Sequence, residues 1–232
     1  MKNENVLVLG SKPGSMLPDI NVNKIYTSNG SAERAVEFRK KYLKNELTSI
    51  VGAGEFIGNK DVSERIINSN PERIIARSGT ISLPSELKKN TNLISLSNNE
   101  QLNFQSKFFK NKKISVLLGE MNYKVKFFDK IKHILKRIKN KNVLGISTGF
   151  YAILLALEEN PNAKIIISGI GMKGGKHFYY SERANKFPYD PRARVDRFMM
   201  SQLINQYKSR LCTLDLDLSE VSEIKQWEGN SF

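Results

Sequence analysis

The stretch NVLGISTGFYAILLALEENPNAKIIISGIG, residues 142–171, contains two apolar runs separated by a helical pattern. Its first residues form a short apolar run that ends in glycine. The segment FYAILLAL at residues 150–157 is apolar throughout, and the run at residues 163–171 is rich in isoleucine and ends in glycines. We expect a strand, a buried helix and a second strand, which is the unit from which parallel sheets are built.

The same alternation continues along the rest of the chain. Several of the short runs are apolar at nearly every position, which is typical of strands covered on both faces. The sequence therefore predicts one α/β domain over residues 1–232, with a Rossmann-like, mostly parallel sheet flanked by helices. The expected strands are 6–10, 24–29, 47–54, 73–77, 92–97, 163–171 and 211–216, and the expected helices include 30–45 and 193–210.

Composition limits the class of protein. The chain has 232 residues, of which 40% are hydrophobic, and this suits one packed domain. It carries 37 Lys plus Arg against 23 Asp plus Glu, and the net charge of +14 favours anionic partners or, equally, a solvated basic surface. Cys212 is the single cysteine, so a disulfide within the chain is excluded. No apolar run is long enough to cross a bilayer, and we expect a cytoplasmic protein.

In parallel sheets of this kind, ligands bind at the carboxyl ends of the strands. The turn after the first strand can present amides and hydroxyls to a phosphate or a sugar, although a plain turn fits as well. It lacks the spacing of GxGxxG and of GxxxxGK(S/T). Asn29 ends the second strand, where its amide can bind a base or ribose, or cap the next helix as Ser31 can. The candidate residues here are Gly10, Ser11, Lys12, Pro13, Gly14, Ser15, Asn29 and, after the third strand, Gly52.

Two further turns are candidates. Ser147, Thr148 and Gly149 open the apolar helix, where they either cap it or bind an anion. The turn of Ser168, Gly169, Ile170 and Gly171 ends the strand that follows.

Histidine is rare in this chain, and His177 lies in the glycine-rich segment GGKHFYY. It is available as a general base near neutral pH, and Tyr179 supplies a phenolic donor. The alternative is an exposed loop whose aromatic residues pack on the sheet. We find no cluster with metal-ligand spacing, since Asp215 and Asp217 fit a solvated strand end. The sequence thus predicts no metal.

The segment 123–142 combines a basic face with an apolar one when it is drawn as a helix. We expect it to make a peripheral contact with anionic lipid at the inner face of a membrane.

Taken in order, these motifs resemble those of the small bacterial sialyltransferases of glycosyltransferase family forty-two and, more distantly, the eukaryotic sialyltransferases. The family has Gly-Asn-Gly-Pro-Ser after its first strand, where this chain has GSKPGS. An asparagine ends its second strand, as Asn29 does here. Its Ser-Gly-Val-Tyr segment corresponds to STGFYA, and its SGID, with a later tyrosine, corresponds to SGIG and Tyr179. The resemblance spans residues 6–214.

The resemblance implies an inverting, metal-independent transferase that takes a sialic-acid-like or Kdo-like sugar from a CMP-activated donor to a glycan or glycolipid. It implies no cofactor beyond this donor substrate. Tyr179 would contact the donor phosphate, Asn29 and the 10–15 turn would hold the nucleotide, Thr148 would lie near the donor, and the 168–171 turn would lie against the cytidine. It also implies a small lid around residues 173–195, and a homo-oligomer is compatible with it.

The chain departs from the family at three places. Lys173 stands where the family has a second tyrosine, and a lysine there can still neutralise phosphate charge. The segment GAG at 52–54 stands where the family has an asparagine after the third strand. The family's base histidine is missing before the helix near residue 193, which leaves His177, Asp190 or Asp196 as the base. We therefore expect His177, Tyr179 and Lys173 to be catalytic. The alternatives are a transferase of the same fold with another nucleotide donor and a basic nucleic-acid-binding protein.

Overall fold

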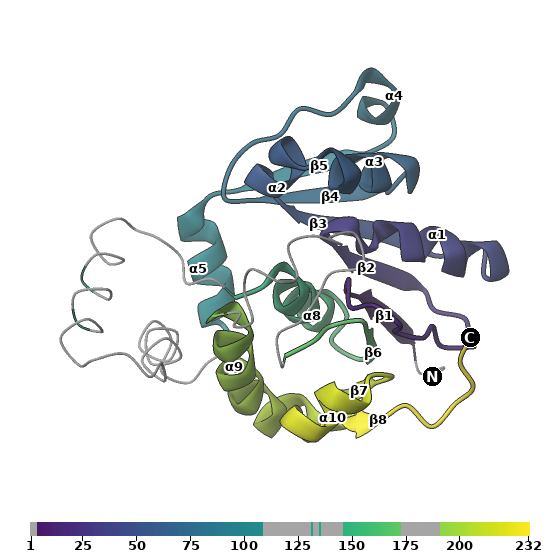
Figure 1. Ribbon diagram of the computed structural model, residues 1–232, viewed down its shortest axis with the longest axis vertical. Coiled ribbons are helices and arrows are strands. Elements are labelled where there is room, and N and C mark those ends of the chain that lie inside the picture. Colours follow the sequence, from purple (N-terminus) through teal and green to yellow (C-terminus); the bar gives the residue numbers. More distant parts are fainter. Residues whose placement is uncertain (1–3, 109–130, 132–134, 136–145, 173–190) are drawn as a thin grey trace.

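The computed structural model describes residues 4–108, 131, 135, 146–172 and 191–232. Within these ranges, eight strands form a single sheet in which every neighbouring pair is parallel (Figure 1). The predicted α/β fold with a parallel sheet is therefore confirmed. In spatial order the strands are β5 (Asn92–Leu96), β4 (Arg73–Arg77), β3 (Glu46–Gly52), β2 (Lys24–Ser28), β1 (Asn5–Leu9), β6 (Lys164–Ser168), β7 (Leu211–Thr213) and β8 (Lys225–Gln226).

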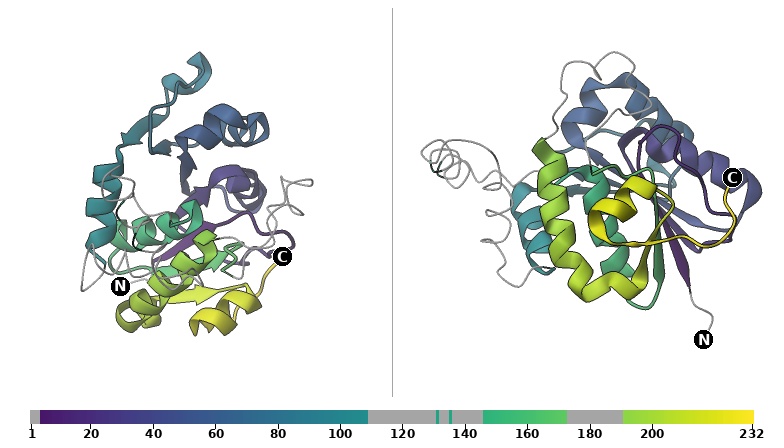
Figure 2. Two further views of the ribbon diagram at one scale, coloured as in Figure 1. Left: turned by 60° about the vertical axis from the view of Figure 1, so that its left-hand side comes forward. Right: turned by 60° about the horizontal axis from the view of Figure 1, so that its bottom comes forward.

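Helices cover both faces of the sheet (Figures 1 and 2). Alternate residues of β1 show the two layers, because Val6 and Val8 pack with α8 while Leu7 and Leu9 pack with α1. One face carries α1 (Ala32–Lys41), α2 (Ala53–Gly58) and α3 (Lys60–Asn68). The other carries α5 (Asn98–Ser106), α8 (Thr148–Glu159), α9 (Pro191–Tyr207) and α10 (Leu216–Ser222), and the short α4 (Ser85–Lys88) precedes β5.

Helix α8 is the predicted apolar helix, and every side chain from Phe150 to Leu157 is buried. A helix that is apolar all round is stable only when it is enclosed on all sides. Figure 2 shows α8 between the sheet and α9. The helix begins at the carboxyl edge of the sheet and ends at the amino edge, where Glu159 meets Arg73 at the start of β4.

The strand order places the reversal of the chain between β1 and β6. From β1 the chain adds strands in one direction as far as β5, and from β6 it adds them in the other. Ligands of such sheets bind outside the carboxyl ends at this switch point. The register brings those ends together, since Leu9 is paired with both Thr27 and Ser168, and Gly52 is paired with Arg77.

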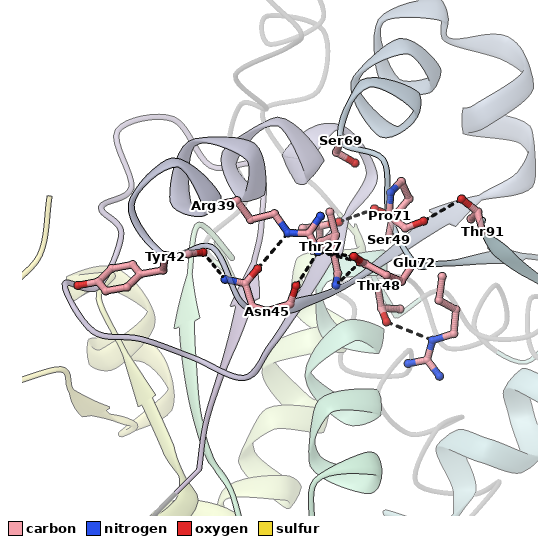
Figure 3. A network of polar contacts seen from close by, with 12 residues as sticks. Thr27, Arg39, Tyr42, Asn45, Thr48, Ser49, Ser69, Pro71, Glu72 and Thr91 are labelled. Atoms are coloured by element: carbon pink, nitrogen blue, oxygen red, sulfur yellow. Dashed lines mark hydrogen bonds and ion pairs between the residues drawn. The ribbon is translucent and has the colours of Figure 1, made fainter. Parts of the chain in front are cut away.

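The opposite, amino edge is closed by ion pairs and hydrogen bonds (Figure 3). Arg39 of α1 donates to both carboxylate oxygens of Glu72, at 2.9 and 2.7 Å, and to the side chain and carbonyl of Asn45. Glu72 also accepts from the amide of Leu47, at 2.7 Å. This network joins α1 to the beginnings of β3 and β4.

Some element boundaries differ from the expected ones. The strand expected at 47–54 ends at Gly52 because α2 begins at Ala53, and the strand expected at 211–216 ends at Thr213 because α10 begins at Leu216. The strand expected at 142–145 lies outside the described residues. The expected lid also lies outside them, apart from its end at 191–195 in α9. The expected basic helix at 123–142 lies outside them too, apart from two exposed residues, Ile131 and Leu135.

Candidate functional site

At the switch point, the turns after β1 and β6 are in direct backbone contact. The amide of Gly10 donates to the carbonyl of Ser168 at 2.7 Å, and the amide of Lys12 donates to the carbonyl of Gly169 at 2.9 Å. A Cβ atom on Gly10 would lie 2.0 Å from the oxygen of Gly169, which also has a φ of +78°. Only glycine fits at both positions, so these two glycines allow the turns after β1 and β6 to lie in direct contact.

The predicted turn of residues 10–15 is held by its own contacts and by α1. The hydroxyl of Ser15 donates to the carbonyl of Lys12 at 2.8 Å, and Arg34 of α1 donates to both the hydroxyl and the carbonyl of Ser15. Burial lowers the pKa of Arg34 from its usual value. The ammonium of Lys12 is paired with Asp217. Arg34, which the sequence analysis did not single out, therefore supplies positive charge behind this turn.

Asn29 follows β2 in the left-handed backbone region, with a φ of 50°. Its side-chain oxygen Oδ1 is buried and has no hydrogen-bond partner among the described residues. The hydroxyl of Ser31 donates instead to the carbonyl of Leu9, at 2.8 Å, and accepts from the amide of Ser28. The capping interpretation of Asn29 is therefore wrong, because a cap would accept a backbone N–H.

The start of α8 combines a capped helix terminus with a buried cation. Ser147 caps the helix by accepting from the amide of Phe150 at 3.0 Å, so the capping interpretation is confirmed for this residue. Arg77, 8% exposed at the end of β4, donates to the hydroxyl of Thr148 at 3.3 Å. Its guanidinium lies 4.6 Å from the ring centroid of Tyr151, and burial raises the pKa of Tyr151 to about 12. The positive end of the helix and the guanidinium together favour an anion.

The turn after β6 is built mainly from internal contacts. Ser168 is fully buried, and its hydroxyl donates to the carbonyl of Met16. The amide of Gly169 donates to Asp215 at 2.6 Å. A Cβ atom on Gly149 would lie 3.4 Å from the side chain of Ile170, so this glycine lets the turn lie close to the start of α8. Asp215 is only 5% exposed, and the expectation of a solvated strand end is wrong for it.

The structure brings most of the predicted residues to one edge. The turns 10–15 and 168–171, Asn29, and the start of α8 at 147–149 surround the ends of β1 and β6, whereas Gly52 lies further along the edge at the end of β3. Lys173, His177, Tyr179 and Asp190 lie outside the described residues. Asp196 is 1% exposed and accepts from the amide of Ser147 at 2.9 Å, which does not suit a base that must meet a substrate.

Three charged residues at this edge were not assigned to the site from the sequence: Arg34, Arg77 and Asp215. Arg77 carried the clearest signal, because it is a cation that closes an apolar strand at the edge where ligands bind. The positions of Arg34 and Asp215 depend on contacts between distant segments, and no local pattern indicates them.

Among the residues described, no three histidine, cysteine, aspartate or glutamate side chains come together as metal ligands. The helices in the described ranges are all too short or too polar to cross a membrane. Comparisons of the chain with models of protein families, with curated proteins and with solved structures gave no match.

Proposed function

We propose that this chain is a metal-independent, inverting glycosyltransferase that transfers a sialic-acid-like or Kdo-like sugar from a CMP-activated donor to a glycan or glycolipid. The observation that carries the proposal is the buried Oδ1 of Asn29, which has no hydrogen-bond partner in the described part of the chain and lies beside the switch point. Leaving a buried acceptor unpaired costs about 1–3 kcal/mol. A ribose hydroxyl or the amino group of cytosine would satisfy it.

The charges at the same edge support an anionic donor. A CMP-sugar of this class carries a phosphate and a carboxylate, and both are stabilised by positive charge. The amino end of α8 and Arg77, which donates to Thr148, supply such charge at the described edge. By the family resemblance Tyr179 would contact this phosphate. Lys173 stands where the family has a second tyrosine, and its ammonium would neutralise phosphate charge.

The reaction is a displacement at the anomeric carbon. The acceptor oxygen forms the new bond while the bond from carbon to the phosphate oxygen breaks, and CMP leaves with that electron pair. The proton of the acceptor hydroxyl goes to a base, for which His177 and Asp190 remain as candidates. Charge develops on the phosphate as the bond breaks, and fixed donors around it lower the barrier most.

The proposal includes a peripheral contact between segment 123–142 and anionic lipid. Its support is the sequence pattern of a basic and an apolar face. Sedimentation with vesicles at low salt tests it, and stronger binding to anionic than to neutral vesicles is expected. Equal binding to both would remove this part of the proposal.

Nucleotide binding tests the central part. In a thermal-shift and calorimetric panel of CMP, UDP, S-adenosylmethionine and NAD, we expect CMP alone to stabilise the protein, by about 2.7 kcal/mol at a hundredfold excess over Kd. Stabilisation by one of the others would favour a transferase with another nucleotide donor. Stabilisation by none of them would leave the nucleotide site without support.

Asn29→Gly and its control Asn70→Gly make the test specific to the site. Both asparagines have positive φ, at 50° and 45°, so glycine suits both backbones. Asn70 is exposed and precedes β4 at the opposite edge of the sheet. We expect Asn29→Gly to weaken CMP binding about tenfold and Asn70→Gly to leave it unchanged. Equal affinities for the two variants would remove Asn29 from the site.

A further inference from the structure

The carboxylate of Asp215 is turned away from its own helix. Asp215 occupies the N-cap position of α10, where aspartate commonly accepts from the first amides of the helix, but its side chain makes no such bond. Its Oδ2 accepts instead from the amide of Gly169, at 2.6 Å. A residue placed as a helix cap is therefore used to hold the turn after β6.

Charged groups from three elements surround this carboxylate. Lys12, in the turn after β1, places its Nζ 4.0 Å from Oδ1 of Asp215 and pairs with Asp217 of α10. Arg34 of α1, which holds Ser15, interacts electrostatically with Asp215 as well. The side chain of Asp215 is 3% exposed, and a buried carboxylate is tolerated only when charges and hydrogen bonds compensate it.

The contacts of Asp215 join the ends of β1, β6 and β7. The same Gly169 whose amide it binds is in backbone contact with Gly10 and accepts from the amide of Lys12. Asp215 is therefore linked through Gly169 to both glycine turns at the switch point. Asp215 itself lies behind the turn and does not need to touch a nucleotide.

We infer that Asp215 is a positioning residue, whose ionised carboxylate holds the 168–171 turn against Gly10 in the conformation that receives the nucleotide. This inference rests on the proposed function, because the nucleotide is the ligand whose affinity reports it.

Protonation of Asp215 should release the turn without unfolding the protein. Burial raises the pKa of Asp215, while the amide of Gly169 and the charge of Lys12 act in the opposite direction. Because the pKa of Asp215 is higher in the folded protein than in the unfolded chain, protonation of this carboxyl does not lower the folding stability as the pH falls. The neutral form is a weaker acceptor for the amide of Gly169, so nucleotide affinity should fall on acidification while the fold remains.

Calorimetry of CMP binding at neutral pH and at stepwise lower pH, for as long as the protein stays folded, tests the inference, with Asp215→Asn compared with the wild type and Asp217→Asn as a control. At each pH we compare the CMP affinity of the wild type with that of Asp215→Asn. The ratio of these two affinities cancels the titration of the CMP phosphate, whose second pKa is about 6. We expect Asp215→Asn to bind CMP about tenfold more weakly at neutral pH. The ratio should approach one as acid neutralises Asp215 in the wild type. Asp217→Asn, which keeps the bond to Gly169, should stay within about twofold.

The outcomes separate the inference from the proposed function. Equal CMP affinity of the wild type and Asp215→Asn at every pH would overturn the inference alone. Absence of CMP binding by the wild type would overturn both. Should Asp215→Asn not fold, the amide proton shift of Gly169 in the wild type decides: it should titrate as the pH falls, and a constant shift would overturn the inference.

Discussion

Gly10 and Gly169 meet at the switch point of the sheet so closely that a methyl group on Gly10 would lie 2.0 Å from the carbonyl oxygen of Gly169. The amide of Gly10 donates to the carbonyl of Ser168, the residue before Gly169, at 2.7 Å. The contact joins the two turns that were predicted from the sequence to bind the nucleotide. The proposed site therefore requires that these two turns stay in contact.

Gly10→Ala should destabilise the protein by at least about 3 kcal/mol, because the new methyl group meets backbone atoms that cannot move aside. It should also abolish CMP binding, since the two turns must separate to admit the methyl group. Urea unfolding and calorimetry measure the two effects.

Gly54→Ala is the matched control. A Cβ atom on Gly54, within α2, would meet nothing within 4 Å. Alanine there should raise stability by about 0.5–1 kcal/mol and leave CMP binding unchanged. Equal stabilities of the Gly10→Ala and Gly54→Ala proteins would show that the two turns are not in contact in solution.

The ion pair between Arg73 and Glu159 should contribute measurably to stability. Arg73 donates to both carboxylate oxygens of Glu159, at 2.9 and 2.5 Å, and the buried Tyr26 donates to the same carboxylate at 2.7 Å. Arg73→Met leaves a half-buried carboxylate with one partner fewer. We expect the free energy of unfolding to fall by about 2 kcal/mol, which is less than the loss on breaking a fully buried ion pair.

Lys60→Met provides the comparison for Arg73→Met. Lys60 pairs with Glu64 on the exposed surface of α3, where an ion pair adds little. This substitution should change the free energy of unfolding by less than about 0.5 kcal/mol. Similar losses of unfolding free energy for the two variants would argue against the ion pair between Arg73 and Glu159 in solution.

Alkaline pH should destabilise the protein partly through Cys212. Burial raises the pKa of this thiol from 9.0 to about 11. Because the folded state favours the neutral thiol, the stability it contributes is complete below pH 9 and is lost as the pH rises towards 11. Between about pH 8 and about pH 10 the free energy of unfolding of the wild type should fall by about 1 kcal/mol more than that of Cys212→Ala. Parallel losses in urea unfolding at the two pH values would contradict this assignment.

The sequence was most informative where local pattern and tertiary structure agree. Apolar runs such as 73–77 became strands with the expected bounds, and the apolar segment 150–157 became the enclosed helix. Helix α5 was missed because its apolar residues do not recur on one face. Ser97 and Glu100 form a capping box at its start, however, and the spacing of serine and glutamate could have indicated it.

The candidate site was predictable only in part. Turns that end strands could be placed at one edge because parallel strands share a direction, and Asn29 was recognised as a residue of that edge. Which polar groups are used internally could not be predicted. Ser168 binds Met16 and Asp215 binds Gly169 only because segments distant in sequence meet in the fold.

A crystal structure with bound CMP is the decisive measurement for the proposed nucleotide site. We expect CMP at the carboxyl edge between β1 and β6, with a ribose hydroxyl or the cytosine amino group donating to Oδ1 of Asn29 and the 10–15 turn beside the nucleotide. CMP bound elsewhere, or Asn29 left unpaired beside a nucleotide bound at this edge, would contradict it.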